Sequence, residues 1–113
     1  LQLEVTRDRS VMARVDRQGG VENLYRLHLQ NYDTAAHDYA VTVSGLPGLR
    51  VDTPRDTRIA SGEGRTLVVS VKAPAQDMAQ KVARGIAPLE FTVRASGDNR
   101  QQRTRASTFL FPH

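Results

Sequence analysis

The fold is decided by residues 21–31, which read VENLYRLHLQN. The odd positions are Val21, Asn23, Tyr25, Leu27, Leu29 and Asn31, and the even ones include Glu22, Arg26, His28 and Gln30. Apolar and amide side chains therefore alternate with charged and polar ones. A period of two predicts a β-strand with one face in a core and the other in water.

The same alternation returns along the rest of the chain. It is carried by Tyr39, Val41 and Val43, by Leu67, Val69, Val71 and Ala73, and by Leu89, Phe91, Val93 and Ala95. Short strands are also expected near residues 1–5, 12–15 and 49–52, and a last one over 104–111, whose buried side the pattern leaves open. Glycine-rich turns separate these segments. About seven or eight short strands predict an all-β, antiparallel sandwich with Greek-key connections.

One segment departs from the strand pattern. Residues 75–84 have helical propensity, with Met78 and Val82 four positions apart and Gly85 placed as a stop signal. Such a short helix is marginal alone, so it is expected to dock against the sandwich. We expect one short helical crossover here.

Length and composition indicate one domain spanning residues 1–113. The 113 residues are 39% hydrophobic, which suits a single core and leaves no room for a second. The chain has no cysteine, so thiol catalysis and cysteine-ligated zinc or iron–sulfur sites are excluded within it. It begins at Leu1, already in a strand-like pattern, and is expected to be an excised part of a longer protein.

The net charge of +4 comes from 16 Lys and Arg against 12 Asp and Glu. Proteins that bind single-stranded nucleic acid usually combine basic surfaces with exposed aromatic rings for base stacking. Aromatic residues make up only 5% of this chain, and most fall at core positions of the strands. No nucleic-acid partner is therefore expected.

The sequence contains no pattern typical of an active site. Its serines lack the context of a nucleophile elbow, and residues 62–64 precede a strand, whereas a phosphate-binding loop precedes a helix. His28, His37 and His113 lack the short spacing that marks a local metal site, and all three are expected to face solvent. We expect a domain that is not an enzyme and holds no metal or cofactor.

Arginines cluster near the end of the chain, where residues 94–105 are expected to form a hairpin. Arg94, Arg100, Arg103 and Arg105 are accompanied there only by Asp98. Such arginines could bind anionic lipid headgroups or an acidic protein partner. Charge on an edge strand also discourages pairing with another chain, and this protective role is the favoured interpretation.

The ordered motifs resemble the C-terminal immunoglobulin-like domain of the FixG/CcoG family of cytochrome oxidase accessory proteins. The resemblance is carried by Arg7-Asp8-Arg9, Glu22-Asn23-Leu24-Tyr25-Arg26-Leu27, Asn31, His37-Asp38-Tyr39, Gly45-Leu46-Pro47-Gly48, Pro74, Pro88-Leu89-Glu90-Phe91 and Ser107-Thr108-Phe109. Each motif alone is weak, but the ordered set covers nearly the whole chain. The resemblance implies an immunoglobulin-like sandwich.

The resemblance also implies a larger parent protein. Members of this family look like membrane proteins with two [4Fe–4S] clusters that reduce copper for assembly of the cbb-type cytochrome oxidase. The sandwich would be their terminal module on the periplasmic side of the bacterial inner membrane. No cofactor is expected in the present domain, which would be soluble although the parent is anchored in the membrane.

Several motif residues are expected to have structural roles. Arg7 and Arg9 could form an ion-pair and capping cluster around Asp8. Asn23 and Asn31 lie on the inward side of their strand and would tie neighbouring loops to the sheet through hydrogen bonds. Tyr25 would fill the core, and the turn around Pro47 would depend on the conformational freedom of its two glycines. These two glycines are Gly45 and Gly48.

Three functional hypotheses follow. The first is a periplasmic interaction or scaffold domain that contacts an oxidase subunit or a copper-handling factor. The second is a copper-delivery domain of the same protein, using His28, His37 or Met12. The third is an unrelated extracellular adhesion or carbohydrate-binding sandwich, which is less favoured because the chain has no Trp to stack on sugars.

Overall fold

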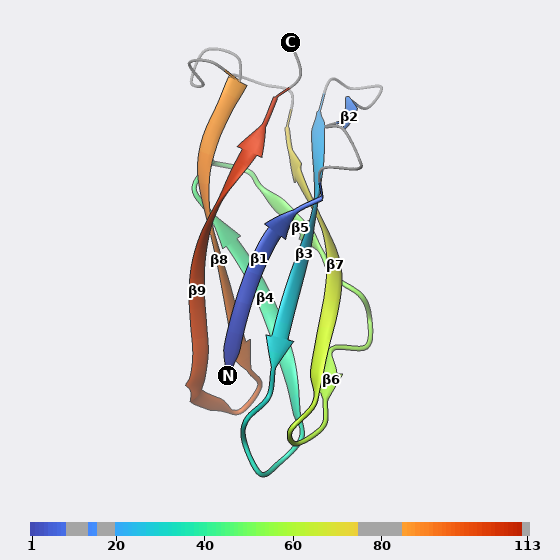
Figure 1. Ribbon diagram of the computed structural model, residues 1–113. Helices are drawn as coiled ribbons and strands as arrows, with labels where there is room; N and C mark the ends of the chain where they lie inside the picture. Colours follow the sequence, from blue (N-terminus) through green and yellow to red (C-terminus); the bar gives the residue numbers. More distant parts are fainter. Residues whose placement is uncertain (9–13, 16–19, 75–84, 112–113) are drawn as a thin grey trace.

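Two antiparallel sheets pack face to face in this computed structural model, which describes residues 1–8, 14–15, 20–74 and 85–111 (Figure 1). The first sheet has the order β1-β3-β7-β5, with β2 also paired to β3, and the second has the order β6-β4-β8-β9. The strands are β1 (Gln2–Arg7), β2 (Arg14–Val15), β3 (Val21–Gln30), β4 (His37–Ser44), β5 (Arg50–Asp52), β6 (Arg58–Ile59), β7 (Gly64–Ala73), β8 (Ile86–Ala95) and β9 (Asp98–Leu110).

The core lies between the sheets and is built from the alternate residues of each strand. β3 shows the pattern most clearly, because Val21, Asn23, Tyr25, Leu27 and Leu29 are all buried. The aromatic rings of Tyr25 and Phe91 meet in the middle, with centroids 4.9 Å apart. The odd positions identified in β4, β7 and β8 are buried or half-buried in the same way. The predicted antiparallel sandwich is therefore confirmed.

The last strand resolves a question that its sequence left open. Phe109 is fully buried, and Ser107 on the same side is half-buried, whereas Thr108 on the other side is exposed. The short strands expected near residues 12–15 and 49–52 appear as β2 and β5. The expected helical crossover, residues 75–84, lies outside the described residues.

The turn between β4 and β5 needs its glycines. Gly45 and Gly48 have φ angles of 133° and 76°, values that side-chain-bearing residues rarely adopt. A Cβ atom on Gly45 would also lie only 2.5 Å from the carbonyl oxygen of Pro88. Pro47, between them, is exposed.

Loops from both sheets meet at one end of the sandwich. The chain passes between the sheets after β3, and again between β6 and β7. These two connections and the β8–β9 turn lie together at the lower end of Figure 1, where β1 also begins. We call this end the base, and define it by residues 31–36, 60–63 and 96–97. In the described part of the chain, no helix is long and apolar enough to span a membrane.

Candidate functional site

The exposed edge of β9 can be identified from its pairing with β8. The two strands keep one register from Ile86 opposite Leu110 to Arg94 opposite Gln102. The amide of Phe111 donates to the carbonyl of Gly85 at 2.8 Å, one step beyond this ladder. Because hydrogen-bonded and non-hydrogen-bonded pairs alternate, the odd residues of β9 turn their backbone groups toward β8. The even residues turn theirs away from β8, toward the outer edge of the sheet, where β1 lies nearby (Figure 1).

Side chains of β3 close the upper part of this edge. The Asn23 amide donates to the Leu110 carbonyl at 2.9 Å and accepts from the Leu110 amide at 3.0 Å, as a neighbouring strand would. The Tyr25 hydroxyl donates to the Thr108 carbonyl at 2.7 Å. Burial raises the pKa of Tyr25 above its ordinary value, partly opposed by the charge of Arg7. Asn23 and Tyr25 thus link β3 of the first sheet to β9, the edge strand of the second.

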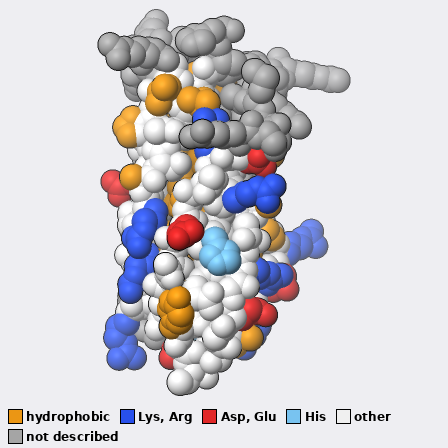
Figure 2. Space-filling model, in the orientation of Figure 1, with side chains coloured by type: hydrophobic (Ala, Val, Ile, Leu, Met, Phe, Trp, Pro, Cys, Tyr) orange, Lys and Arg blue, Asp and Glu red, His pale blue; other side chains and the backbone are white. Residues whose placement is uncertain are grey.

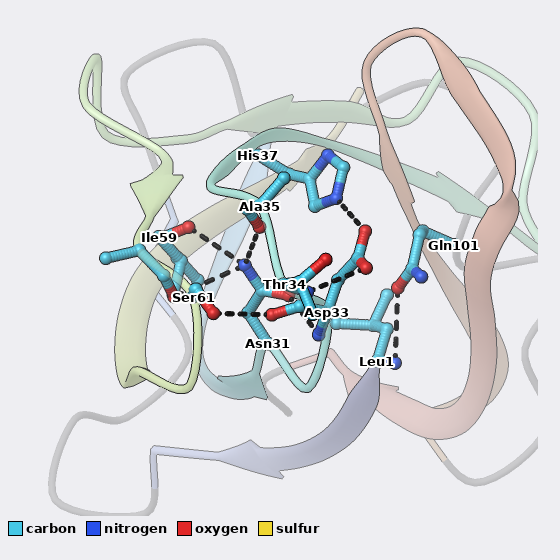
Figure 3. A network of polar contacts seen from close by, with 10 residues as sticks. Leu1, Asn31, Asp33, Thr34, Ala35, His37, Ile59, Ser61 and Gln101 are labelled. Atoms are coloured by element: carbon cyan, nitrogen blue, oxygen red, sulfur yellow. Dashed lines mark hydrogen bonds and ion pairs between the residues drawn. The ribbon is translucent and has the colours of Figure 1, made fainter.

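Asn31 joins the loops at the base (Figure 3). Its side chain is fully buried, and its Nδ2 group lies 3.0 Å from the carbonyl oxygens of Ala35 and Ile59 and 3.2 Å from that of Ala60. Its Oδ1 atom accepts from the amide of Asp33 at 2.9 Å. One side chain therefore connects the β3–β4 loop to the end of β6.

Asp33 and His37 form a close pair beside Asn31. Asp33 Oδ2 lies 2.6 Å from His37 Nε2. This hydrogen bond, the Thr34 amide and the charges of His37 and Arg100 hold the pKa of Asp33 below its usual value, although partial burial opposes them. His37 was expected to face solvent, but its side chain is only 13% exposed. It begins β4 on the same side as Tyr39, and Tyr39 is buried in the core. Sequence reasoning missed the pair, whose only sequence signal is an i, i+4 spacing in a loop.

Tyr39 places a further polar group near this pair. Its ring meets that of His37 edge-on at 6.0 Å. Its hydroxyl is buried and has no hydrogen-bond partner among the described residues. Burial raises the pKa of Tyr39, and the charge of Asp33 raises it further. A carboxylate of the base thus lies close to an imidazole and a phenol at the start of β4.

The four arginines of the hairpin do not form one cluster. Arg94 lies opposite Gln102 on the outer face of the second sheet, and Arg100 is near enough to Asp33 to lower its pKa. Arg103 and Arg105 lie on the other side of β9, and both are exposed. Figure 2 shows Lys and Arg side chains along the side of the molecule where β9 lies. Only Arg103 and Arg105 share one side of one strand.

Both of these arginines cover the edge of their own strand. The Arg103 guanidinium donates to the Gln102 carbonyl at 2.7 Å, and that of Arg105 donates to the Thr104 carbonyl at 2.8 Å. None of the ion pairs found among the described residues includes Arg94, Arg103 or Arg105. Their charges therefore remain available to a partner.

The Arg7-Asp8-Arg9 motif lies at the end of β1. Asp8 forms an ion pair of 3.4 Å with Arg26 on β3, a partner that sequence reasoning did not name. The Asp8 amide also donates to the Leu24 carbonyl at 2.8 Å. Arg7 lies half-buried opposite Tyr25, and Arg9 lies outside the described residues.

The two described histidines lie on different sheets. His28 is on the outer face of β3, with its Nδ1 atom 3.0 Å from Thr66 Oγ1, whereas His37 begins β4 next to the base. Within the described ranges, no three His, Asp or Glu side chains are grouped so that they could hold a metal ion. Met12, Met78 and His113 lie outside these ranges.

Two antiparallel sheets with a filled core and with crossings between them at both ends define the chain as an immunoglobulin-like β-sandwich. The family model described as "IG-like fold at C-terminal of FixG, putative oxidoreductase" matches residues 1–112. The chain belongs to this family of FixG C-terminal domains, which confirms the resemblance found in its motifs.

A solved structure agrees with the assignment of the fold. The crystal structure of a FixG-related protein from Vibrio parahaemolyticus superimposes with a TM-score of 0.76 at 23% sequence identity. The similarity covers 96% of this chain and 94% of that one. A comparison with curated proteins finds no match.

Proposed function

We propose that this chain is a non-catalytic interaction and scaffold domain of a FixG/CcoG-like membrane protein, on the periplasmic side of the bacterial inner membrane. In this proposal the parent protein reduces copper and serves assembly of the cbb-type cytochrome oxidase. The domain positions it against an oxidase subunit or a copper-handling factor. Membership in the FixG family supports the proposal.

The observation that carries the proposal is how the buried polar side chains are used. Asn23, Tyr25 and Asn31 each bond to backbone groups of a distant segment, so they maintain the shape of the domain. The available charges, those of Arg94, Arg103 and Arg105, are exposed on the second sheet, where they can contact another protein. A chain without cysteine also cannot supply the thiolates of an iron–sulfur cluster, so such clusters would belong to other parts of the parent.

Deleting residues 1–113 from the intact parent protein tests this role. We expect the shortened protein to keep its clusters, measured by their absorbance, but to lose co-purification of oxidase assembly factors and to reduce the yield of mature oxidase. Normal binding and normal oxidase maturation would rule the proposal out. Loss of the clusters would show that the domain instead supports folding of the parent.

Copper delivery is the second candidate, and the Asp33–His37 pair favours it. A carboxylate that bonds one nitrogen of a histidine commonly orients the ring for metal binding through the other nitrogen. Titration of the 113-residue chain with Cu(I) and Cu(II) tests this idea, with His37→Gln and His28→Gln as matched variants. Binding that His37→Gln leaves unchanged would remove it. The third hypothesis, an unrelated adhesion or carbohydrate-binding domain, is disfavoured by the family assignment.

A further inference from the structure

We infer that the outer face of the second sheet packs against the same face of a second copy of this chain, with the two copies related by a two-fold axis. The inference goes beyond the proposed function, because it concerns contacts between copies of the chain and not contacts with an oxidase subunit or a copper-handling factor. The surface consists of the outward-facing residues of 40–44, 90–94 and 102–106, which we call the threonine face.

The threonine face is regular and has few charges. β4, β8 and β9 keep one register here, so three outward residues from each strand form three rows across the sheet. The middle row consists of Thr42, Thr92 and Thr104, and the rows on either side contain Glu90 and Arg94 among alanine, serine and glutamine. Thr92 is half-buried and the other residues of the face are exposed. Short side chains across three strands allow a second sheet to approach closely.

The hydroxyl groups of the middle row already have partners. Thr92 Oγ1 lies 3.0 Å from Thr104 Oγ1, and the Thr42 hydroxyl donates to the Thr92 carbonyl at 3.5 Å. Polar groups that are hydrogen-bonded within the sheet can be covered without the cost of an unpaired donor or acceptor. The centre of the face can therefore lose water against another sheet.

Glu90 and Arg94 determine which sheet fits. They lie on either side of Thr92 on β8, roughly 13 Å apart in extended geometry. In the part of the chain that the structure describes, neither side chain takes part in an ion pair. A two-fold axis that crosses β8 at Thr92, at right angles to the strand and in the plane of the interface, places Glu90 of each copy opposite Arg94 of the other. The threonine face is thus complementary in charge to itself, as a two-fold interface requires.

The same two charges select the direction of packing. A two-fold axis along β8 would place Glu90 against Glu90 and Arg94 against Arg94, which is unfavourable. The favoured arrangement is therefore antiparallel and stacks the row of threonines on itself. The angle of about 30° between packed sheets displaces the charged groups by only about 3 Å, which is within the reach of an arginine side chain.

We expect this pairing to be weak in solution. Three residues from each of three strands are fewer than the roughly 20–30 residues on each side of a standard interface. The isolated chain should therefore dimerise with a dissociation constant of about 0.1–1 mM. Anchoring of the parent in a membrane, which belongs to the proposed function, would raise its local concentration and favour the pair.

Sedimentation equilibrium of the 113-residue chain, at concentrations up to about 2 mM, tests the proposal. We expect dimers of the wild type. Glu90→Arg and Arg94→Glu should each weaken self-association by at least about tenfold, because each substitution turns both charge pairs into repulsions. An equimolar mixture of these two variants should associate at least as tightly as the wild type, because each variant then meets charges of the opposite sign.

Two substitutions on β5 serve as matched controls for net charge. Arg50→Glu and Asp52→Arg change the charge by the same amounts, but both positions are exposed on the first sheet, away from the threonine face. Each should change the dissociation constant by less than about twofold, because distant surface charges are screened by salt. Thermal denaturation checks that every variant remains folded.

The double substitution Glu90→Arg/Arg94→Glu should restore dimers to within about threefold of the wild type, since unlike charges again face each other. A wild type that stays monomeric at every concentration would overturn the proposal and leave the face to a different partner. Equal weakening by the β5 controls would overturn it as well, as would mixed variants that fail to associate. None of these results changes the outcome of the deletion experiment, which measures binding of other proteins to the parent.

Discussion

At the scale of single residues, this domain depends on buried asparagine side chains. Their amide groups form hydrogen bonds with backbone groups that have no strand partner there. Asn31 is fully buried and satisfies carbonyl groups of two loops, so its loss would leave several polar groups buried without a partner. Unsatisfied buried groups of this kind each cost about 1–3 kcal/mol. The side chain is small, but its removal affects the whole base.

We therefore expect Asn31→Ala to lower the free energy of unfolding by about 2–4 kcal/mol, since more than one carbonyl loses its donor. Urea denaturation followed by circular dichroism measures this change. Gln102→Ala, at an exposed position, serves as the control and should change the free energy by less than about 0.5 kcal/mol. A small effect of Asn31→Ala would mean that water replaces the amide at the base.

Asp33 makes the stability of the domain depend on acid. Its pKa in the folded state is lowered, mainly by the hydrogen bond to His37, so the unfolded state takes up a proton first as the pH falls. The stabilisation is complete above the ordinary Asp pKa of about 4 and is lost as the pH drops through the lower folded value. Denaturation midpoints measured across this range should fall less steeply for Asp33→Asn than for the wild type. An unchanged slope would contradict the assignment.

At the scale of elements, the turn between β4 and β5 depends on a close approach of two backbones. Gly45 combines a positive φ with a contact to β8 that leaves no space for a Cβ atom. Gly62, in the β6–β7 turn, also has a positive φ but no atom near its Cβ position. The two glycines therefore form a natural comparison of backbone strain with and without a clash.

Alanine substitutions separate these effects. Gly62→Ala should cost about 1 kcal/mol through backbone strain alone, whereas Gly45→Ala should cost at least about 2–3 kcal/mol, because β4 and β8 must also move apart. Chemical denaturation measures both values in the same buffer. Equal costs would show that the turn can shift without disturbing the sheet.

At the scale of the whole molecule, side chains at the two ends of β3 connect the sheets separately. Asn23 closes the edge at Leu110, and Asn31 binds the loops at the base. Asn23 lies on β3 and Asn31 directly follows it, so the two are eight positions apart, roughly 27 Å in extended geometry. They share no partner among the described contacts, so each should contribute on its own to the stability of a single cooperative unit.

The double variant Asn23→Ala/Asn31→Ala should therefore lose the sum of the two single losses, within about 0.5 kcal/mol. Equilibrium unfolding monitored by both fluorescence and circular dichroism measures the losses and checks that the transitions coincide. A sum that fails by more than this amount would indicate that the two ends of the sandwich are coupled through β3.

Much of this fold follows from the sequence alone. The two-residue period of residues 21–31 correctly identified the buried side of β3, because side-chain direction in a strand is a local property. The absence of cysteine excluded thiol catalysis and cysteine-ligated metal sites within the chain. The order of the motifs identified the family to which the chain belongs.

The tertiary structure decided which edges and loops meet. Asn23 reaches Leu110, which is 87 positions away, and Arg100 at the start of β9 comes near Asp33 in the β3–β4 loop. It also separated the four arginines, which looked like one group. Arg94 lies on the outer face of the second sheet, Arg100 lies near Asp33, and Arg103 and Arg105 lie on the other side of β9. The physical reason is that alternation specifies only which side of a strand is apolar. The packing of two sheets determines which strand ends as a free edge and what lies beside it.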